Sequence, residues 1–170
     1  MSRPFLVVPP TIDRWVVPRT VLDETRTLLA SPGEEGCEAV VLWLGWVASP
    51  REARVTLAFP PRQIAYRTEA GLAVEIPVEE WTALALQLPP GAFVLAKVHT
   101  HAGEAYHSEV DAANPYLSHE GAVAITVPNF ARDPLTDLTT CSVNVRRDRQ
   151  WQELGEAEVR EIFTIEEVAT

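Results

Sequence analysis

The chain has 170 residues, of which 46% are hydrophobic, and a formal net charge of −10 at pH 7. This length is typical of one domain with a sizeable core, and the acidic charge argues against a nucleic-acid partner because it repels phosphates. No apolar run is long enough to span a membrane, and the two cysteines form no disulfide or zinc-finger pattern. We therefore expect a cytoplasmic protein without a membrane partner.

The first half of the chain predicts an extended segment, a helix and two strands. Prolines favour extended structure over residues 1–16, and apolar side chains at helical spacing predict a helix over 18–33. Residues 38–47 are almost all apolar and rich in β-formers, which predicts a central strand buried on both faces. Residues 54–59 alternate as in a half-exposed partner strand, and 62–76, with Gly71 as a turn candidate, predict a short extended segment.

The second half predicts three helices and three strands. The predicted helices cover residues 78–88, 111–118 and 151–163, and the predicted strands cover 93–98, 122–127 and 138–145. This order predicts an α/β (mixed α+β) fold, with one mixed sheet flanked by helices. We expect a single domain over 1–170, with a core over about 15–145 and a C-terminal helix over about 151–163.

Two histidines and a carboxylate form the most informative pattern in the chain. His99 and His101 are two residues apart at the end of a predicted strand, so both imidazoles should lie on one face. Asp111 follows, with Ser108 three residues before it, as in a helix-capping box. Two histidines and one carboxylate are a common catalytic zinc set that leaves the fourth position for water. The pattern predicts one Zn²⁺ per chain, bound by His99, His101 and Asp111.

A hydrolytic zinc site also needs a general base and a donor for the developing oxyanion. Glu38, an acid at the start of an otherwise apolar strand, is the best candidate for the base; Glu34 and Glu35 are close rivals. Glu38 could instead be an ion-paired residue at a strand end. The Ser108 hydroxyl can serve as the oxyanion donor, or it can only cap the helix.

Together these residues resemble the JAMM motif of the JAB1/MPN/Mov34 (MPN+) metalloenzymes. That family shows a glutamate leading an apolar strand that ends in glycine, then His-x-His on a strand, then Ser-x-x-Asp. The matching residues in this chain are Glu38 with Gly45, His99-Thr100-His101, and Ser108-Glu109-Val110-Asp111.

The resemblance covers roughly residues 15–145 and implies a single MPN/JAB-type domain with cytidine-deaminase-like layering. The chain departs from the family in the loop after the second histidine. Ala102 stands where the family usually has proline, and the interval from His101 to Asp111 is one residue shorter than usual. This departure affects the course of the loop rather than the set of ligands.

The resemblance implies a zinc-dependent isopeptidase or peptidase that cleaves at or after the C-terminus of a ubiquitin-like protein. Glu38 would be the general base and Ser108 the oxyanion donor. The bacterial deubiquitinase-like branch acts beside ubiquitin-activating and conjugating-type enzymes of the same operon, including antiphage systems. Such enzymes bind the substrate tail as an added strand, and residues 62–76 or 128–137 could border that groove.

Two other functions remain open on the sequence. The first is a non-catalytic scaffold of the same fold, although this chain keeps all five motif residues, which weighs against it. The second is a metallopeptidase that acts on a sulfur-carrier protein or a small peptide. Precursor processing and deconjugation use the same chemistry, so the sequence does not separate them, and it leaves the oligomeric state open.

Overall fold

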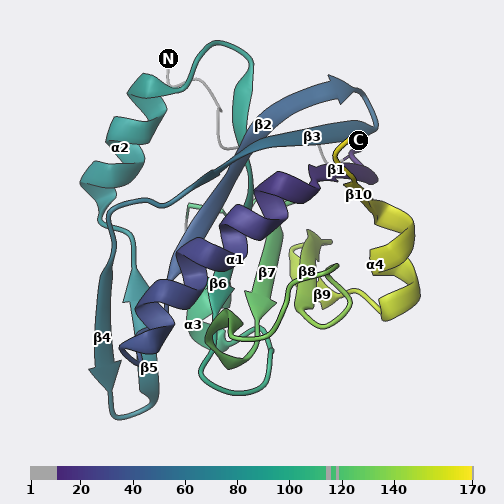
Figure 1. Ribbon diagram of the computed structural model, residues 1–170. Coiled ribbons are helices and arrows are strands. Elements are labelled where there is room, and N and C mark those ends of the chain that lie inside the picture. Colours follow the sequence, from purple (N-terminus) through teal and green to yellow (C-terminus); the bar gives the residue numbers. More distant parts are fainter. Residues whose placement is uncertain (1–10, 114–115, 118, 170) are drawn as a thin grey trace.

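The computed structural model describes residues 11–113, 116–117 and 119–169 (Figure 1). One large sheet contains the strands β1 (Arg14–Pro18), β2 (Val40–Ser49), β3 (Glu52–Phe59), β6 (Ala92–Thr100), β7 (Val123–Val127), β8 (Ser142–Arg147), β9 (Gln150–Glu153) and β10 (Phe163–Glu166). A separate hairpin contains β4 (Ile64–Thr68) and β5 (Gly71–Glu75). The helices are α1 (Arg19–Glu34), α2 (Val78–Gln87), α3 (Glu109–Ala112) and α4 (Glu156–Ile162), with a 3₁₀ turn η1 (Asn129–Ala131).

The large sheet is mixed and has the order β10-β1-β3-β2-β6-β7-β8-β9. β2 pairs antiparallel with β3 and β6, whereas β6 and β7 are parallel. The first six residues of β2 are all buried, which confirms the predicted central strand. Its Gly45 lies at a bulge where a Cβ atom would sit 2.0 Å from the Arg54 carbonyl oxygen, so no larger residue fits.

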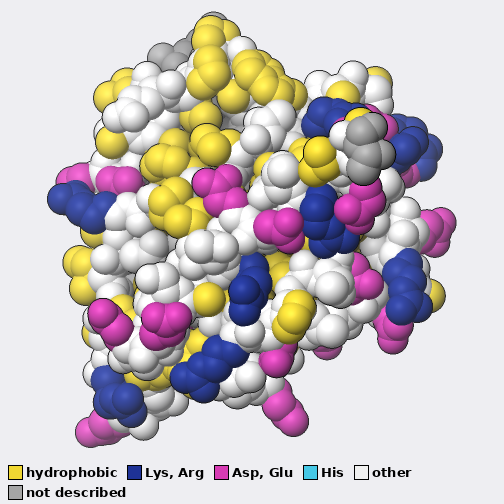
Figure 2. Space-filling view, viewed as in Figure 1, with side chains coloured by type: hydrophobic (Ala, Val, Ile, Leu, Met, Phe, Trp, Pro, Cys, Tyr) yellow, Lys and Arg dark blue, Asp and Glu magenta, His cyan; other side chains and the backbone are white. Residues whose placement is uncertain are grey.

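The two faces of this sheet have separate cores. Helix α1 crosses one face in Figure 1, and its Leu22 and Leu29 pack in a cluster with Val98 and Ile125. On the other face, α2 forms a smaller cluster with alternate residues of β2 and with Val94 of β6. In Figure 2, acidic and basic side chains are interspersed over the α1 side of the molecule, while hydrophobic side chains gather in the upper part, around α2. None of the helices in the described ranges is long and apolar enough to cross a membrane.

Local backbone geometry changes several predicted boundaries. Residues 62–76 form the β4–β5 hairpin rather than one extended segment, and the chain turns just before Gly71, the predicted turn candidate. The strand predicted from residue 138 begins at Ser142, because Asp137 accepts two hydrogen bonds from Thr139 and turns the chain there. The helix predicted over 111–118 is a single turn, α3; residues 114, 115 and 118 lie outside the described residues, as do residues 1–10 of the predicted N-terminal extended segment.

The C-terminal helix is shorter than the predicted 151–163. Asp148 and Arg149 both have positive φ angles, 51° and 64°, and form a two-residue turn that joins β8 to β9. Trp151 therefore lies on a strand, and α4 begins only after Gly155. The apolar spacing over 151–163 fits a helix, but the turn before this segment directs its first three residues into the sheet.

Candidate metal centre

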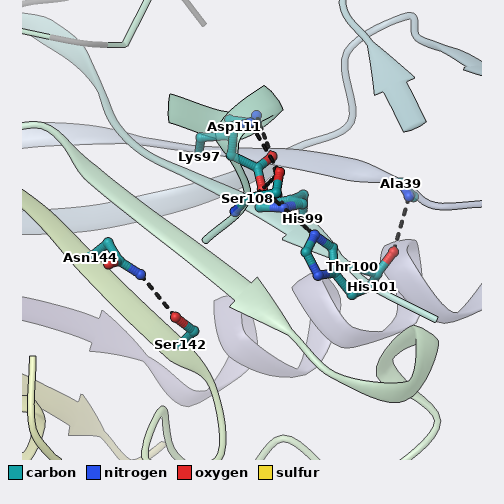
Figure 3. Close-up of polar contacts among 9 residues, drawn as sticks. All are labelled: Ala39, Lys97, His99, Thr100, His101, Ser108, Asp111, Ser142 and Asn144. Atoms are coloured by element: carbon teal, nitrogen blue, oxygen red, sulfur yellow. Dashed lines mark hydrogen bonds and ion pairs between the residues drawn. The ribbon is translucent and has the colours of Figure 1, made fainter. Parts of the chain in front are cut away.

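Three side chains converge where β6 ends. His99 lies in β6, His101 follows it directly, and Asp111 comes from α3 (Figure 3). The two Nε2 atoms are 3.3 Å apart, Asp111 Oδ1 lies 3.0 Å from His99 Nε2, and Asp111 Oδ2 lies 3.6 Å from His101 Nε2. These three residues form the one group of metal-ligand type within the described part of the chain.

The spacing of these atoms fits a tetrahedral metal ion. Zinc–nitrogen bonds of about 2.0–2.1 Å at tetrahedral angles place neighbouring ligand atoms roughly 3.3–3.4 Å apart. The two buried imidazole nitrogens face each other and also face the carboxylate. A proton or a cation is needed between these three groups, because their lone pairs would otherwise repel one another. Two imidazoles and one carboxylate also suit a borderline-soft divalent metal. The predicted ligands are thus brought together in an arrangement that can hold such an ion.

The predicted capping box determines which oxygen of Asp111 faces the histidines. Asp111 Oδ2 accepts hydrogen bonds from the Ser108 backbone nitrogen (3.0 Å) and hydroxyl (2.6 Å), while Ser108 Oγ accepts from the Asp111 nitrogen. The other oxygen, Oδ1, therefore faces His99. Burial opposes ionisation of this carboxyl group, but hydrogen bonds from His101 and His99 and the charge of Lys97 outweigh it, so the pKa of Asp111 lies well below its ordinary value. To act as an oxyanion donor, the Ser108 hydroxyl would have to turn away from Asp111.

The loop after His101 is braced by the chain that follows β7. The backbone nitrogen of His101 donates to the Val127 carbonyl, and the nitrogens of Asn129 and Phe130 donate to the carbonyls of Gly103 and His101. All three residues of η1 have left-handed φ angles of 53–56°, a conformation that costs roughly 1–2 kcal/mol per residue outside glycine. This strained turn holds the loop that lacks the proline expected from the family resemblance.

Glu38 lies beside the three ligands. The next residue, Ala39, is joined to Thr100 by two hydrogen bonds, Ala39 N to Thr100 Oγ1 (3.0 Å, Figure 3) and Thr100 N to the Ala39 carbonyl (3.1 Å). Burial raises the pKa of Glu38 and the charge of Asp111 adds to the rise, against the opposing effect of His101. The rivals at positions 34 and 35 are exposed and lie outside the cleft that Glu38 lines.

A cleft of about 630 Å³ opens over these residues. One wall is the loop and helix over 102–111, and the other is the β4–β5 hairpin, including Tyr66 and the consecutive residues Gly71–Val74. The Gln63 side chain bonds both backbone groups of Val40, at 2.7 and 2.9 Å, which fixes the base of the hairpin beside β2. Of the two segments expected to border a groove, 62–76 thus lines the cleft, whereas no residue of 128–137 does.

Lys97 belongs to the site although the sequence analysis did not single it out. Its side chain is only 10% exposed, and its Nζ lies 3.6 Å from Asp111 Oδ1. Burial lowers the pKa of this ammonium group, while Asp111 opposes the shift. Burial also lowers the pKa of His99 to about 4, so its imidazole is neutral and available as a ligand at pH 7. The available signal was a lysine inside an apolar strand, two residues before His99.

The fold and the site define a mixed α/β protein with a buried His-His-Asp cluster, of a type that can hold a metal ion, at the end of a central strand. The chain is 31% identical over 150 residues to the probable metalloprotease y4jG of Sinorhizobium fredii, which covers 88% of this chain and 92% of that protein. The chain belongs to the same family as this probable metalloprotease. No family model matches it.

Many solved structures share the fold, and two bacterial proteins illustrate it. A protein of Desulfitobacterium hafniense superposes with a TM-score of 0.60 at 14% identity, over 91% of this chain and 94% of that one. A protein of Salinibacter ruber superposes with a TM-score of 0.51 at 17% identity, over 81% of this chain and 87% of that one. At these identities the comparisons establish the mixed α/β fold. The chemistry has to be argued from the site residues.

Proposed function

We propose that this protein is a zinc-dependent peptidase of the JAMM type, with one zinc ion per chain bound by His99, His101 and Asp111. The observation that carries the proposal is the convergence of the three ligand atoms beside Glu38 in an open cleft. The relationship to a probable metalloprotease supports the same chemistry. Zinc in such a site supplies a Lewis acid and lowers the pKa of water toward about 7.

The protein's own groups would move the protons. Glu38, whose pKa is raised by burial, accepts a proton from the attacking water and delivers it to the leaving amine. The Ser108 hydroxyl turns from Asp111 Oδ2 to donate to the oxyanion, while the Ser108 backbone nitrogen keeps its bond to that carboxylate. The Lys97 ammonium group lies next to Asp111 Oδ1 and favours the ionised carboxylate, while Ser108 bonds the other oxygen, Oδ2.

The proposed substrate is the C-terminal tail of a ubiquitin-like protein, cleaved during precursor processing or deconjugation. The hairpin supports this choice, because within the described residues β5 pairs with β4 alone, and Gly71–Val74 line the cleft above the ligands. An extended tail can add to such an edge through main-chain hydrogen bonds. Tyr66 and Tyr106, which are 41% and 58% exposed, offer apolar contacts across the cleft. We propose a bacterial deubiquitinase-like role beside activating and conjugating-type enzymes.

The test combines metal analysis with a substrate panel. We expect about one zinc per chain and cleavage of ubiquitin-like fusions and isopeptide conjugates. Glu38→Gln should reduce kcat by about 10²–10⁴-fold with zinc content and folding unchanged, whereas Glu35→Gln, a nearby exposed control, should match the parent. Parental turnover by Glu38→Gln would refute the base assignment. Cleavage of short peptides alone would favour a small-peptide metallopeptidase, and absence of both zinc and turnover would favour a scaffold.

A further inference from the structure

A row of buried polar side chains crosses the sheet on the face that carries His99. Thr126, Ser142 and Asn144 are 0%, 2% and 4% exposed. In the strand register His99 of β6 lies beside Thr126 of β7, and Thr126 lies beside Ser142 of β8. Register partners project to the same face of a sheet. The row therefore begins at a metal ligand and runs outward across two further strands.

The outer half of the row is hydrogen-bonded. Ser142 Oγ donates to Glu153 Oε1 of β9 at 2.8 Å, and Asn144 Nδ2 donates to Ser142 Oγ at 2.9 Å (Figure 3). A hydroxyl group has one proton and two acceptor positions. Ser142 therefore donates toward the edge of the sheet and keeps one acceptor position for a donor on the side of Thr126.

The inner half contains two polar atoms without partners. His99 Nδ1 and Thr126 Oγ1 are both buried, and neither has a hydrogen-bond partner among the described residues. Val40, the neighbour of His99 on its other side, has no polar side-chain atom to offer. Each unsatisfied buried group costs about 1–3 kcal/mol. Two such atoms at adjacent register positions can satisfy each other by a rotation of the threonine side chain about its Cα–Cβ bond or through one water.

We infer that Thr126 is the outer hydrogen-bond partner of the metal ligand His99. His99 Nδ1–H donates to Thr126 Oγ1, directly or through one water, Thr126 donates to Ser142 Oγ, and Ser142 donates to the Glu153 carboxylate. Every donor in this chain has one acceptor, and the direction places the histidine proton on Nδ1. The Nε2 lone pair is then free for the metal. This inference rests on the metal site of the proposed function and assigns a positioning role to Thr126.

The test uses zinc affinity, measured by competition with a chromophoric chelator. Thr126→Val keeps the shape of the side chain and removes the acceptor, and we expect it to weaken zinc binding about 10–100-fold. Thr126→Ser should restore affinity to within roughly threefold of the parent, because it keeps the hydroxyl. Thr56→Val, at an exposed position of β3, is the matched control and should not change the affinity.

A second measurement separates positioning from packing. Proton NMR of the zinc-loaded protein, in which Nε2 of His99 is occupied by the metal, should show the Nδ1–H proton of His99 hydrogen-bonded and shifted downfield in the parent, and shifted upfield in Thr126→Val. Parental zinc affinity and an unchanged Nδ1–H resonance in Thr126→Val would overturn the inference. A chain that binds zinc in a Thr126-dependent way but cleaves nothing would refute only the proposed peptidase. A chain that binds no zinc would refute the metal site and this inference with it.

Discussion

The strands β6, β7 and β8 present different chemistry on their two faces. Toward α1 their side chains are aliphatic and fully buried, as at Val98, Ile125 and Val143. On the opposite face, alternate residues of the same strands are the ammonium, imidazole, hydroxyl and amide groups of Lys97, His99, Thr126, Ser142 and Asn144. Burying polar groups costs free energy unless they are paired, whereas aliphatic burial stabilises. We infer that the aliphatic face sustains the fold and that the polar face holds the chemistry at a cost in stability.

The largest effect should come from the aliphatic face. Ile125→Ala removes a fully buried side chain and should lower the free energy of unfolding by about 2–5 kcal/mol, measured by urea denaturation. Zinc affinity of the folded variant should remain at the parental value, because the side chain points away from the ligands. Ile125→Val should give a milder loss of about 0.5–1.5 kcal/mol. A tenfold change in zinc affinity in either variant would break the division between the faces.

The polar face should make the metal-free protein sensitive to acid. The unfolded chain protonates His99 near the ordinary pKa of 6.5, and the folded chain does so at about 4. Between these values the unfolded state binds more protons, so the stability present above pH 6.5 falls as the pH drops toward 4. We expect this group to account for a loss of roughly 3 kcal/mol, at about 1.4 kcal/mol per unit. Urea titrations at several pH values should show a shallower dependence in His99→Gln; an equal slope would contradict the assignment.

Lys97 and a metal ion should compete for the same carboxylate. Lys97→Met removes the ammonium group beside Asp111 Oδ1 and leaves a partly buried negative charge, so the metal-free protein should lose stability. A bound cation supplies the missing positive charge, so zinc affinity should rise by about tenfold, equivalent to about 1.4 kcal/mol. Chelator competition measures the affinity, and thermal unfolding with and without zinc measures the coupling. Weaker zinc binding by Lys97→Met would show that the lysine orients the carboxylate instead.

The smallest effect should come from the β8–β9 turn, outside both faces. Asp148 and Arg149 hold positive φ angles that asparagine and glycine adopt more easily. The double change Asp148→Asn and Arg149→Gly should therefore raise the free energy of unfolding by roughly 1 kcal/mol. Zinc affinity should stay at the parental value, because the turn touches no ligand. A decrease in stability would show that these side chains contribute contacts that outweigh the backbone strain.

Local signals in the sequence were enough to predict the central strands and the convergence of His99, His101 and Asp111, whose role as metal ligands stays a prediction. Alternation along β6 correctly placed His99 and His101 on one face, and the three-residue spacing of Ser108 and Asp111 correctly predicted the capping box. Each of these features is determined by residues close in sequence. The role of Glu38 as a base stays a prediction, although the structure places its side chain in the cleft beside the ligands.

The features that the sequence analysis missed depend on which strands are neighbours. Thr126 and Ser142 are ordinary strand residues until β7 is known to lie between β6 and β8. Lys97 gains a partner only when α3 brings Asp111 over the sheet. The left-handed η1 turn has no sequence signature, because its residues Asn129–Ala131 include no glycine. Strand register and long-range packing decide these features, and periodicity along the chain carries no information about either.

The brace on His101 has a consequence for the order of events during synthesis. All three metal ligands have been made once residue 111 is added, yet the loop that carries His101 is fixed by backbone groups of Val127 and Phe130. At ribosomal rates of about 5–20 residues per second, roughly 1–4 s separate the last ligand from that brace. A nascent chain in this interval has every ligand and no site. The protein should therefore acquire its metal only after β7 has joined the sheet.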